Sequence, residues 1–294
     1  MRWLVTGAQG QLGSALVRLL EERGEVVQGH GSSLDVADPG AVEAALAAGP
    51  APVLLNAAAF THVDRCEREP AQAERVNARA PAELGRICRE RGVQLVHVST
   101  DYVFDGESER PYTEEDAPAP RSVYGSTKLA GERAVLAADG GFLVVRTSWV
   151  FGRGRNFVAN VIGQAAGGEG TPLRVVDDQT GRPTYAADLA RGILALVEGG
   201  RRGLYHLAGG GTATWWDVAR TALDLAGRSD LPVERIRTAD LDLPAPRPRY
   251  SVLACGKAEA AGVRLRDWKD ALAAYLESDD APRCVRSHGR IADA

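Results

Sequence analysis

The chain has 294 residues, enough for one large hydrophobic core or for one core and a smaller second domain. Its formal net charge is −4 and its 35 basic residues form no Lys/Arg run, which argues against a nucleic-acid partner. The N-terminus carries no secretory pattern, no apolar stretch approaches membrane-spanning length, and the four cysteines lack metal-binding spacing, so we expect a cytoplasmic protein with neither membrane contact nor metal.

The first predicted elements surround three glycines. An apolar run at Trp3–Val5 leads into Gly7, Gly10 and Gly13, and apolar residues at helical spacing follow. Glycines allow a tight turn and a close backbone approach, and a helix start offers unpaired N–H groups, so this pattern is typical of a phosphate cradle. We predict a dinucleotide site here; the alternative is a tight turn without a ligand.

Strand-like and helix-like segments then alternate as far as Val150. We expect helices from Gln11 to Gly24, Ala41 to Ala47, Pro81 to Arg91 and Ser122 to Ala138. We expect strands at Glu25–Gln28, Val53–Asn56, Gln94–Ser99 and Phe142–Arg146. This alternation predicts an α/β protein with a doubly wound parallel sheet of the Rossmann type, with ligands beyond the carboxyl ends of the strands.

The alternation loosens after Val150. The later predicted elements are a helix at Phe157–Ala166, a strand at Arg174–Val176, a helix at Ala186–Glu198, a strand at Leu204–Leu207, a helix from Thr212 or Thr214 to Ala226 and a helix at Asp267–Leu276. We therefore expect a dinucleotide-binding domain of residues 1–150 plus 186–208 and a smaller substrate-binding domain of residues 151–185 plus 209–277. The polar, aperiodic residues 278–294 predict a disordered tail.

Tyr124 and Lys128 stand four residues apart in a predicted helix, which places them on one helical face. An ammonium beside a phenol lowers the phenol's pKa, so the pair predicts a tyrosine that exchanges a proton with a carbonyl group near neutral pH. The alternative is an incidental pair on a surface helix.

Ser99 and Thr100 end a predicted strand, at the edge of the sheet where ligands bind. A hydroxyl there can donate a hydrogen bond to a substrate carbonyl oxygen and stabilise its developing charge. Taken alone, two hydroxyls after a strand indicate a turn or a cap. Together with the glycine turn and the Tyr124/Lys128 pair they favour an active site.

These features resemble the extended branch of the short-chain dehydrogenase/reductase superfamily, and within it the dTDP-4-dehydrorhamnose reductases. The resemblance runs from about Arg2 to Leu276. Its motifs are Asn56–Asp64 with Glu67, Asn77, Ser99–Gly106 (STDYVFDG), Arg146–Phe151, Asn156-Phe157, Asp178–Thr184 and Arg247–Ser251.

The resemblance implies a role for each matching position. The catalytic residues would be Thr100, Tyr124 and Lys128, with Tyr124 protonating the C4 oxygen of the sugar. The cofactor-binding residues would be Gly7, Gly10, Gln11, Leu12, Gly13, Asp35, Val36, Ala57, Ala58, Ala59, Asn77, Ser99, Tyr124 and Lys128. The substrate-binding residues would be Thr100, Asp101, Tyr102, Trp149, Asn156, Gln179 and Arg247. Plain alternatives are a core position for Trp149, a helix cap for Asn156 and a surface charge for Arg247.

The end of the second strand departs from strict NAD binders, which carry an acid there. Here the segment reads Gln28-Gly-His-Gly-Ser-Ser33, without an acid and without the arginine of a strict NADP binder. We expect permissive use of NADPH or NADH, with NADPH used at least as well. The metal-linked dimer of some relatives is not carried over, so the chain is expected to be a monomer or a homodimer.

The expected function is NAD(P)H-dependent reduction of the C4 ketone of a dTDP-4-keto-6-deoxy-hexose, with dTDP-4-dehydro-L-rhamnose as the default. Alternatives are another nucleotide-sugar reductase or epimerase of antibiotic-sugar biosynthesis, such as a streptose-type pathway, and a non-catalytic nucleotide-binding regulatory subunit. A sugar-nucleotide dehydratase is disfavoured because Tyr102 stands where such enzymes carry a glutamate.

Overall fold

The structure is a computed structural model that describes residues 2–49, 52–167 and 172–282. Its centre is a six-stranded sheet in the order β10-β5-β4-β3-β1-β2, and every neighbouring pair in it is parallel. The strands are β1 (Arg2–Thr6), β2 (Val26–His30), β3 (Val53–Asn56), β4 (Gln94–Thr100), β5 (Leu143–Thr147) and β10 (Gly203–His206). This confirms the predicted doubly wound α/β fold, and β10 rejoins the sheet as expected.

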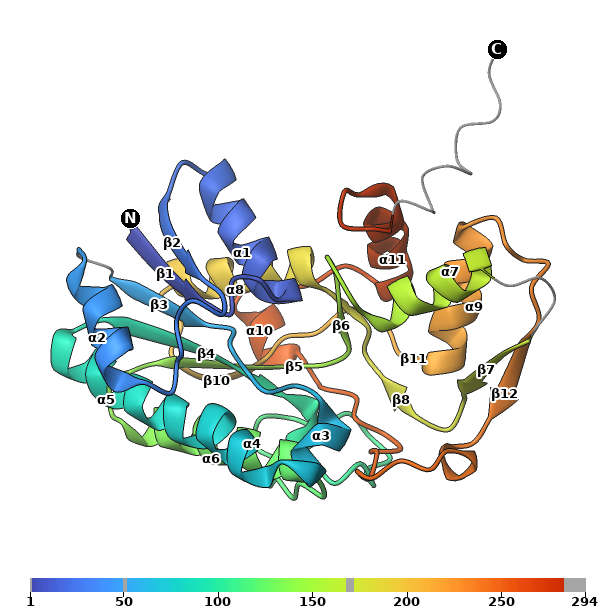
Figure 1. Ribbon diagram of the computed structural model, residues 1–294, viewed down its shortest axis with the longest axis horizontal. Helices are drawn as coiled ribbons and strands as arrows, with labels where there is room; N and C mark the ends of the chain where they lie inside the picture. The colour runs from blue at the N-terminus through green and yellow to red at the C-terminus, as the bar shows by residue number, and fades with distance from the viewer. Residues whose placement is uncertain (1, 50–51, 168–171, 283–294) are drawn as a thin grey trace, which may run out of the picture.

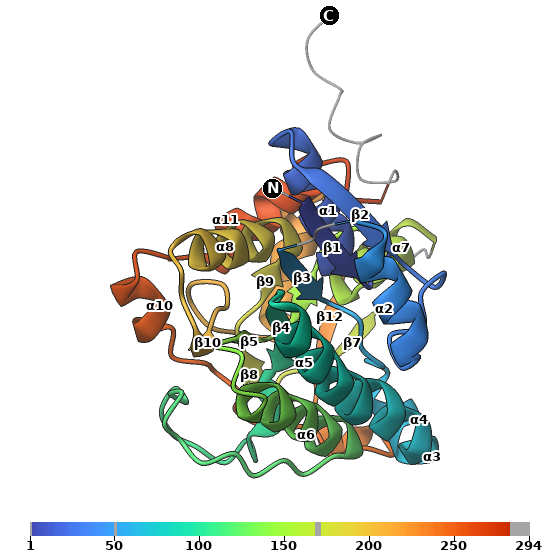
Figure 2. The same ribbon diagram turned by 90° about the vertical axis from the view of Figure 1, so that its left-hand side faces the viewer.

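Helices cover both faces of the sheet (Figures 1 and 2). On one face lie α1 (Gln11–Glu22) and α8 (Ala186–Glu198); on the other lie α2 (Pro39–Ala47), α5 (Ala80–Arg91) and α6 (Val123–Ala137). Successive residues of a strand point to opposite faces. Accordingly Val5, Leu55, Val96 and Val145 pack into the core under α1 and α8, whereas Leu4, Leu54, Leu95 and Val144 pack into the core on the α2 and α5 side.

The helix ends follow the residues that predicted them. Asp38 accepts hydrogen bonds from Gly40 N and Ala41 N, and Pro39 opens α2. Gly24 and Gly92 follow α1 and α5 with φ of 73° and 65°, the left-handed conformation that glycine adopts without strain. The structure thus starts α2 at Pro39 rather than at Ala41.

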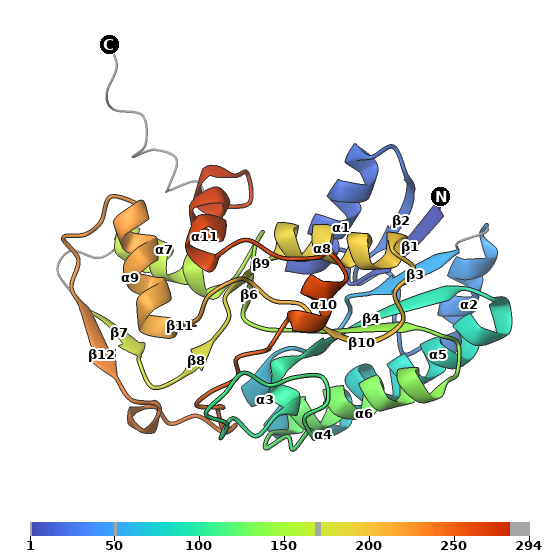
Figure 3. The same ribbon diagram turned by 180° about the vertical axis from the view of Figure 1, so that it is seen from behind.

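A second group of elements lies beside the carboxyl ends of the central strands (Figures 1 and 3). Three short strand pairs join distant segments: β6 (Val150–Phe151) with β9 (Thr184–Tyr185), β7 (Leu173–Val176) with β12 (Val233–Ile236), and β8 (Thr180–Gly181) with β11 (Ala213–Thr214). The helices are α7 (Phe157–Gly167), α9 (Trp215–Leu225) and α11 (Trp268–Glu277), which share one apolar core. The exact domain boundaries remain a prediction.

The remaining elements are short. They are α3 (Val63–Arg68), α4 (Pro70–Glu74), the π-helical turn η1 (Arg75–Arg79), the 3-10 turns η2 (Asp101–Val103) and η3 (Thr238–Asp240), and α10 (Gly256–Ala260). Within the described residues, no helix is both long and apolar enough to span a bilayer.

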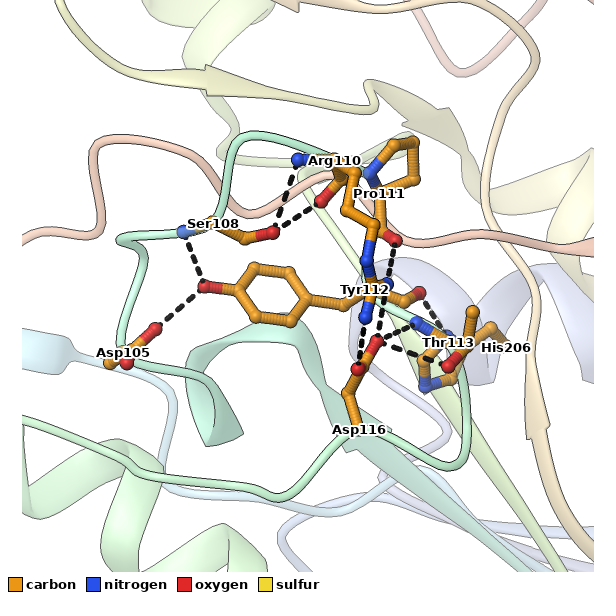
Figure 4. A network of polar contacts seen from close by, with 8 residues as sticks. All are labelled: Asp105, Ser108, Arg110, Pro111, Tyr112, Thr113, Asp116 and His206. Carbon is orange, nitrogen blue, oxygen red and sulfur yellow. Dashed lines mark hydrogen bonds and ion pairs between the residues drawn. The ribbon is translucent and has the colours of Figure 1, made fainter.

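The loop that follows η2 is held by polar contacts of its own (Figure 4). The Tyr112 hydroxyl donates to Asp105 over 2.6 Å and accepts from Ser108 N. Asp116 accepts from Thr113 N over 2.7 Å and pairs with Arg110. The bonds that hold the loop beside β10 are those of His206, whose backbone N–H donates to Glu114 over 2.7 Å and whose Nδ1 lies 3.1 Å from the carbonyl oxygen of Tyr112.

The segment from Ser278 was expected to be disordered, and this expectation is wrong for its first residues. Asp280 is buried, accepts two hydrogen bonds from Arg18 over 2.7 and 2.8 Å, and accepts one from the Tyr185 hydroxyl over 3.0 Å. These bonds attach the end of α11 to α1. Residues 283–294 of the predicted tail lie outside the described residues.

A buried ion pair joins α6 to the central sheet. Arg146 on β5 donates to Glu132 on α6 over 2.9 and 2.5 Å, and both side chains are only 2% exposed. Arg146 also donates to His206 Nε2 at 3.2 Å, while His206 Nδ1 lies 3.1 Å from the carbonyl oxygen of Tyr112. Burial, and then the charge of Arg146, lower the pKa of His206 to about 3, so His206 is neutral.

We predict that Glu132→Ala lowers the free energy of unfolding by about 3–5 kcal/mol, because it leaves the Arg146 guanidinium buried without a counter-charge. The measurement is urea unfolding. Glu90→Ala, which removes an exposed partner of Arg86, is the matched control and should cost less than about 1 kcal/mol. Equal losses in the two variants would contradict the prediction.

Candidate active site

The glycine turn stands at the β1–α1 junction and has no room for side chains. Gly7 has φ of 68°, and a Cβ added to it would lie 2.7 Å from backbone atoms of Ala57 and Ala58. A Cβ on Gly13 would lie 2.0 Å from the carbonyl oxygen of Gly7. Gly10 precedes α1 and, among the described residues, no side chain caps that helix start. Exposed backbone and a positive helix end fit a dinucleotide pyrophosphate.

The other predicted cofactor residues surround this turn. Leu12 and Val36 are buried, and Ala57–Ala59 follow β3 directly against Gly7. Asp35 is half exposed; it accepts from Ala37 N and pairs with Arg75, and these contacts lower its pKa. The predicted cofactor contact by Asp35 thus competes with its ion pair to Arg75, which the sequence did not predict.

Asn77 is buried in η1 and acts on the segment after β3. Its side-chain oxygen accepts from Phe60 N over 2.8 Å, and its amide nitrogen donates to Phe60 O over 3.0 Å. The structure therefore uses Asn77 to hold the chain that lines the cofactor side. A direct cofactor contact by Asn77 stays a prediction.

The end of β4 brings buried polar groups together. Thr100 Oγ1 donates to Asp101 Oδ1 over 3.0 Å and accepts from Tyr102 N over 3.2 Å. Two buried hydroxyl oxygens at the ends of β4 and β5 have no hydrogen-bond partner among the described residues, Ser99 Oγ and Thr147 Oγ1, and the buried Asp101 carboxylate has the Ser251 hydroxyl as a neighbour. Buried polar atoms are normally satisfied, so such a cluster at the edge of a sheet is typical of a ligand site.

Tyr124 lies in the first turn of α6, next to Thr100 and Tyr102. Ser122 caps that helix by accepting from Gly125 N, and Glu67 accepts from Val123 N over 2.8 Å. The rings of Tyr102 and Tyr124 meet edge to face at 5.5 Å. Glu67 belongs to a motif of the sequence, but its role in placing Tyr124 was not predicted, because the contact joins segments 56 residues apart.

The expected effect of Lys128 on the phenol is not what the geometry shows. Burial raises the pKa of Tyr124 above its ordinary value, and a hydrogen bond with Thr100 opposes that rise. The Lys128 ammonium instead donates to the carbonyl oxygen of Val98 over 2.7 Å. In this structure burial is the main influence on the pKa of Tyr124, and Lys128 is bonded to Val98 and lies beside His97.

A cleft opens beside Tyr102 and is walled by the proline-rich segment Leu243–Pro248. Its lining residues are Tyr102, Phe104, Asp105, Arg121, Ser122, Pro246, Arg247 and Pro248. Arg247 is mostly buried and donates to Asp64 over 2.7 Å, so it is not the solvated surface charge of the plain alternative. The structure thus brings two predicted substrate residues, Tyr102 and Arg247, to one cleft.

Trp149 and Gln179 form a separate group with Trp215. Trp149 has the left-handed φ of 47°, rare for a bulky residue, and its ring stacks on Trp215 at 3.7 Å. Trp215 Nε1 donates to Gln179 Oε1 over 3.1 Å. A backbone strained in this way is frequent at functional sites. The adjacent tryptophans at 215 and 216 were the only sequence signal for this partner.

Asn156 serves as a helix cap, the plain alternative. Its side-chain oxygen accepts from Ala159 N over 2.9 Å, and its amide nitrogen lies within hydrogen-bond distance of Gly152 O, Gly154 O and the Tyr275 hydroxyl. Its predicted substrate contact has no support in this geometry. In the part of the chain that the structure describes, no group of three His, Cys, Asp or Glu side chains is placed to hold a metal ion.

The glycine cradle, the carboxyl edge of the parallel sheet and the Thr100/Tyr124/Lys128 set define an NAD(P)H-dependent oxidoreductase with the extended short-chain dehydrogenase/reductase fold. A family model described as "RmlD substrate binding domain" matches residues 1–280. The chain belongs to this family.

Individual relatives cover nearly the whole chain. The dTDP-4-dehydrorhamnose reductase of Streptomyces griseus is 46% identical over 281 residues, covering 92% of this chain and 91% of the relative. A probable dTDP-4,6-dihydroxy-2-methyloxan-3-one 4-ketoreductase of Streptomyces antibioticus is 45% identical over 277 residues, covering 92% and 93%. The dTDP-4-dehydrorhamnose reductase of Bacillus anthracis, solved in complex with NADP, is 31% identical with a TM-score of 0.90, covering 94% and 99%.

We predict that Asp101→Asn stabilises the protein at pH 7. Burial raises the pKa of Asp101 from 3.8 to about 6, so the native state binds this proton more tightly than the unfolded state. Stability contributed by Asp101 is therefore present at low pH and is lost as the pH rises from 3.8 through about 6. The gain from Asp101→Asn at pH 7 is at most about 3 kcal/mol and vanishes near pH 3.5.

Urea unfolding at several pH values measures this gain. Asp116→Asn is the control, and its effect should have the opposite sign. Hydrogen bonds from Arg110 and Thr113 lower the pKa of Asp116. The Asp116 carboxylate therefore stabilises the protein at neutral pH, and this stabilisation is lost on acidification. An Asp101→Asn variant that is less stable than wild type at pH 7 would show that the carboxylate is stabilised by contacts outweighing its burial.

Proposed function

We propose that the protein reduces the C4 ketone of a dTDP-4-keto-6-deoxy-hexose with NADPH or NADH, and that Tyr124 is the proton donor. The observation that carries the proposal is the position of Tyr124, which contacts Tyr102 at the carboxyl edge of the sheet, near the buried Ser99 and Thr147 hydroxyls without partners. The names of the Streptomyces and Bacillus relatives supply the substrate class and the nicotinamide cofactor.

In this mechanism the chain's own residues prepare the carbonyl group. When bound, the nicotinamide supplies a hydride to the carbonyl carbon. Thr100 and Tyr124 both offer a hydroxyl to the carbonyl oxygen, and Tyr124 gives it a proton as negative charge develops there. Lys128, directed by Val98, holds the cofactor ribose and supplies the proton that restores Tyr124. One hydride and one proton thus convert the ketone to an alcohol.

The default substrate is dTDP-4-dehydro-L-rhamnose, giving dTDP-L-rhamnose. A 4-ketoreductase of an antibiotic-sugar pathway is the second candidate, and the Streptomyces antibioticus relative favours it. A non-catalytic regulatory subunit is less favoured, because a binding module has no need for the complete Thr100/Tyr124/Lys128 set. The monomeric or homodimeric state, the absence of nucleic-acid binding and the cytoplasmic location stay predictions.

The test is cofactor oxidation by the purified protein across a panel of dTDP-4-keto-6-deoxy sugars, with each product identified by NMR. We expect turnover with one 4-keto sugar and a hydroxyl formed at C4. Cofactor binding without turnover on any sugar would favour the regulatory subunit, and inversion without net reduction would favour an epimerase.

We predict that Tyr124→Phe lowers kcat about 10²-fold or more with little change in dinucleotide affinity, because the lost hydroxyl acts mainly in the transition state. Lys128→Ala should reduce both kcat and cofactor affinity. Steady-state kinetics and cofactor titration measure the two effects. Tyr102→Phe, a neighbouring phenol, is the matched comparison and should raise KM more than it lowers kcat. Wild-type turnover in Tyr124→Phe would assign the proton to another donor.

We predict that the wild type uses NADPH and NADH within about tenfold of each other, or about 1.4 kcal/mol, with NADPH at least as good. Ser32 and Ser33 follow β2 at the exposed surface, and the segment from Gln28 to Ser33 carries no acid that would repel a 2′-phosphate. Ser32→Asp should shift the preference towards NADH by charge repulsion. The ratio of kcat/KM for the two cofactors decides the matter, and a hundredfold wild-type preference for NADH would contradict it.

A further inference from the structure

A row of buried polar side chains crosses the sheet beneath the candidate active site and ends at Lys128. Thr6, Asn56 and His97 are register partners on β1, β3 and β4. Thr6 Oγ1 donates to Asn56 Oδ1 over 2.7 Å, Asn56 Nδ2 lies 3.0 Å from His97 Nδ1, and His97 Nε2 lies 3.4 Å from Lys128 Nζ. All four side chains are almost completely buried.

The hydrogen bonds in this row fix which nitrogen of His97 carries the proton. Ala58 N can only donate, and it donates to Asn56 Oδ1 over 3.3 Å, so the side-chain nitrogen of Asn56 faces His97. That amide nitrogen is a donor, and His97 Nδ1 must therefore accept. A neutral His97 then carries its proton on Nε2, which points at Lys128. Burial, and then the charge of Lys128, lower the pKa of His97 well below its usual value, so the ring is neutral.

The second fully buried histidine of the same sheet has the opposite arrangement. His206 Nδ1 lies 3.1 Å from the carbonyl oxygen of Tyr112, which can only accept, so the proton of His206 is on Nδ1. His206 Nε2 is then an acceptor for the guanidinium of Arg146. One histidine thus accepts from its cation, whereas the other presents an N–H group to its cation.

We propose that His97, held by Asn56 in the tautomer with its proton on Nε2, is a positioning residue that directs the head group of Lys128 and favours its neutral amine over its ammonium form. A neutral amine accepts a hydrogen bond from His97 Nε2, whereas an ammonium faces another donor there. This inference rests on the proposed role of Lys128 in returning a proton to Tyr124, and it assigns the control of that step to a residue that touches neither substrate nor cofactor.

Several other titratable groups near Lys128 have partners of their own. Glu132 is one helical turn away and favours the ammonium, but its carboxylate is bonded to Arg146. Of the groups on the elements packed against α6, those with a partner include Asp101 with Thr100, Cys66 with Phe60 O, Glu67 with Val123 N, Asp64 with Arg247, Glu74 with Arg79, Arg75 with Asp35, and Glu83 and Glu90 with Arg86. The same elements also carry Tyr102 on η2, Arg65 and Arg68 on α3, and Cys88, Arg89 and Arg91 on α5.

Together these effects place the pKa of Lys128 close to neutral pH. Burial lowers the pKa of Lys128 to about 8, and Glu132 opposes that fall. An amine that exchanges its proton in this range can return a proton to a tyrosine at each turnover, whereas a permanently charged ammonium cannot. Burial lowers the pKa of Lys128 without orienting its head group, whereas the contact with His97 Nε2 also orients it.

The chain is well suited to a direct test, because it contains only three lysines, at positions 128, 257 and 269, and five histidines. In protein labelled with ¹³C-lysine, the Cε signal that disappears in Lys128→Ala reports the titration of Lys128. We expect that signal to titrate near pH 8 in the wild type and about one unit higher in His97→Asn. The asparagine keeps an acceptor for Asn56 and removes the N–H group that faces Lys128.

His206→Asn is the matched control, since it makes the same substitution at an equally buried histidine that does not contact Lys128. It should leave the Lys128 titration where it is in the wild type. An unmoved Lys128 signal in His97→Asn, or an equal shift in both variants, would overturn the proposal.

A second measurement needs no variant of His97. In protein labelled with ¹⁵N-histidine, the ring nitrogens of His97 should show a protonated Nε2 and an unprotonated Nδ1, and those of His206 the reverse. A proton on Nδ1 of His97 would overturn the proposal even if every variant failed to fold.

Both NMR measurements are made without substrate, so their results do not depend on whether the protein is a reductase. If the protein reduces a 4-keto sugar, the alkaline limb of kcat/KM against pH should move upwards in His97→Asn by the same amount as the Lys128 titration. A parallel loss of activity at all pH values, with no shift of the limb, would indicate a structural role only and would overturn the proposal.

Discussion

The site depends on how closely the residues that follow β3 pack against the glycine turn between β1 and α1. Gly7 and Ala57 approach so closely that a Cβ at Gly7 would overlap the backbone of Ala57 and Ala58, the residues that follow β3. This contact is available because β1 and β3 are parallel neighbours whose carboxyl ends meet at one edge of the sheet. The same edge collects the ends of β4 and β5, and with them Thr100 and the buried oxygens without partners.

Low polarity around this edge sets the chemistry of its ionisable groups. The same burial acts in opposite directions on acids and bases: it raises the pKa of Asp101 to about 6 and of the Tyr124 phenol, and lowers that of Lys128 to about 8. Burial thus brings the pKa values of Asp101 and Lys128 towards neutrality, which suits proton transfer, whereas it moves the pKa of Tyr124 away from neutrality. The buried charge of Arg146 is instead paired with Glu132.

Local signals in the sequence predicted the fold well, because turns and helix ends are decided by neighbouring residues. Gly24 and Asp38 placed the ends of α1 and α2 to within a few residues. The Thr100, Tyr124 and Lys128 positions followed from spacing and from resemblance. Tertiary partners were not accessible in this way: nothing near Asp280 in the sequence predicts its bonds to Arg18, and nothing near Lys128 predicts His97, since each pair joins distant segments.

The central claim is hydride transfer to the C4 carbon of a dTDP-4-keto sugar, and isotope transfer tests it most directly. The purified protein is supplied with NADPH carrying deuterium on the transferred face of the nicotinamide, and the sugar product is examined by NMR. Our account predicts one deuterium per product molecule, bound to C4, in a single configuration. Deuterium at another carbon, or a C4 hydrogen that derives from solvent, would contradict it.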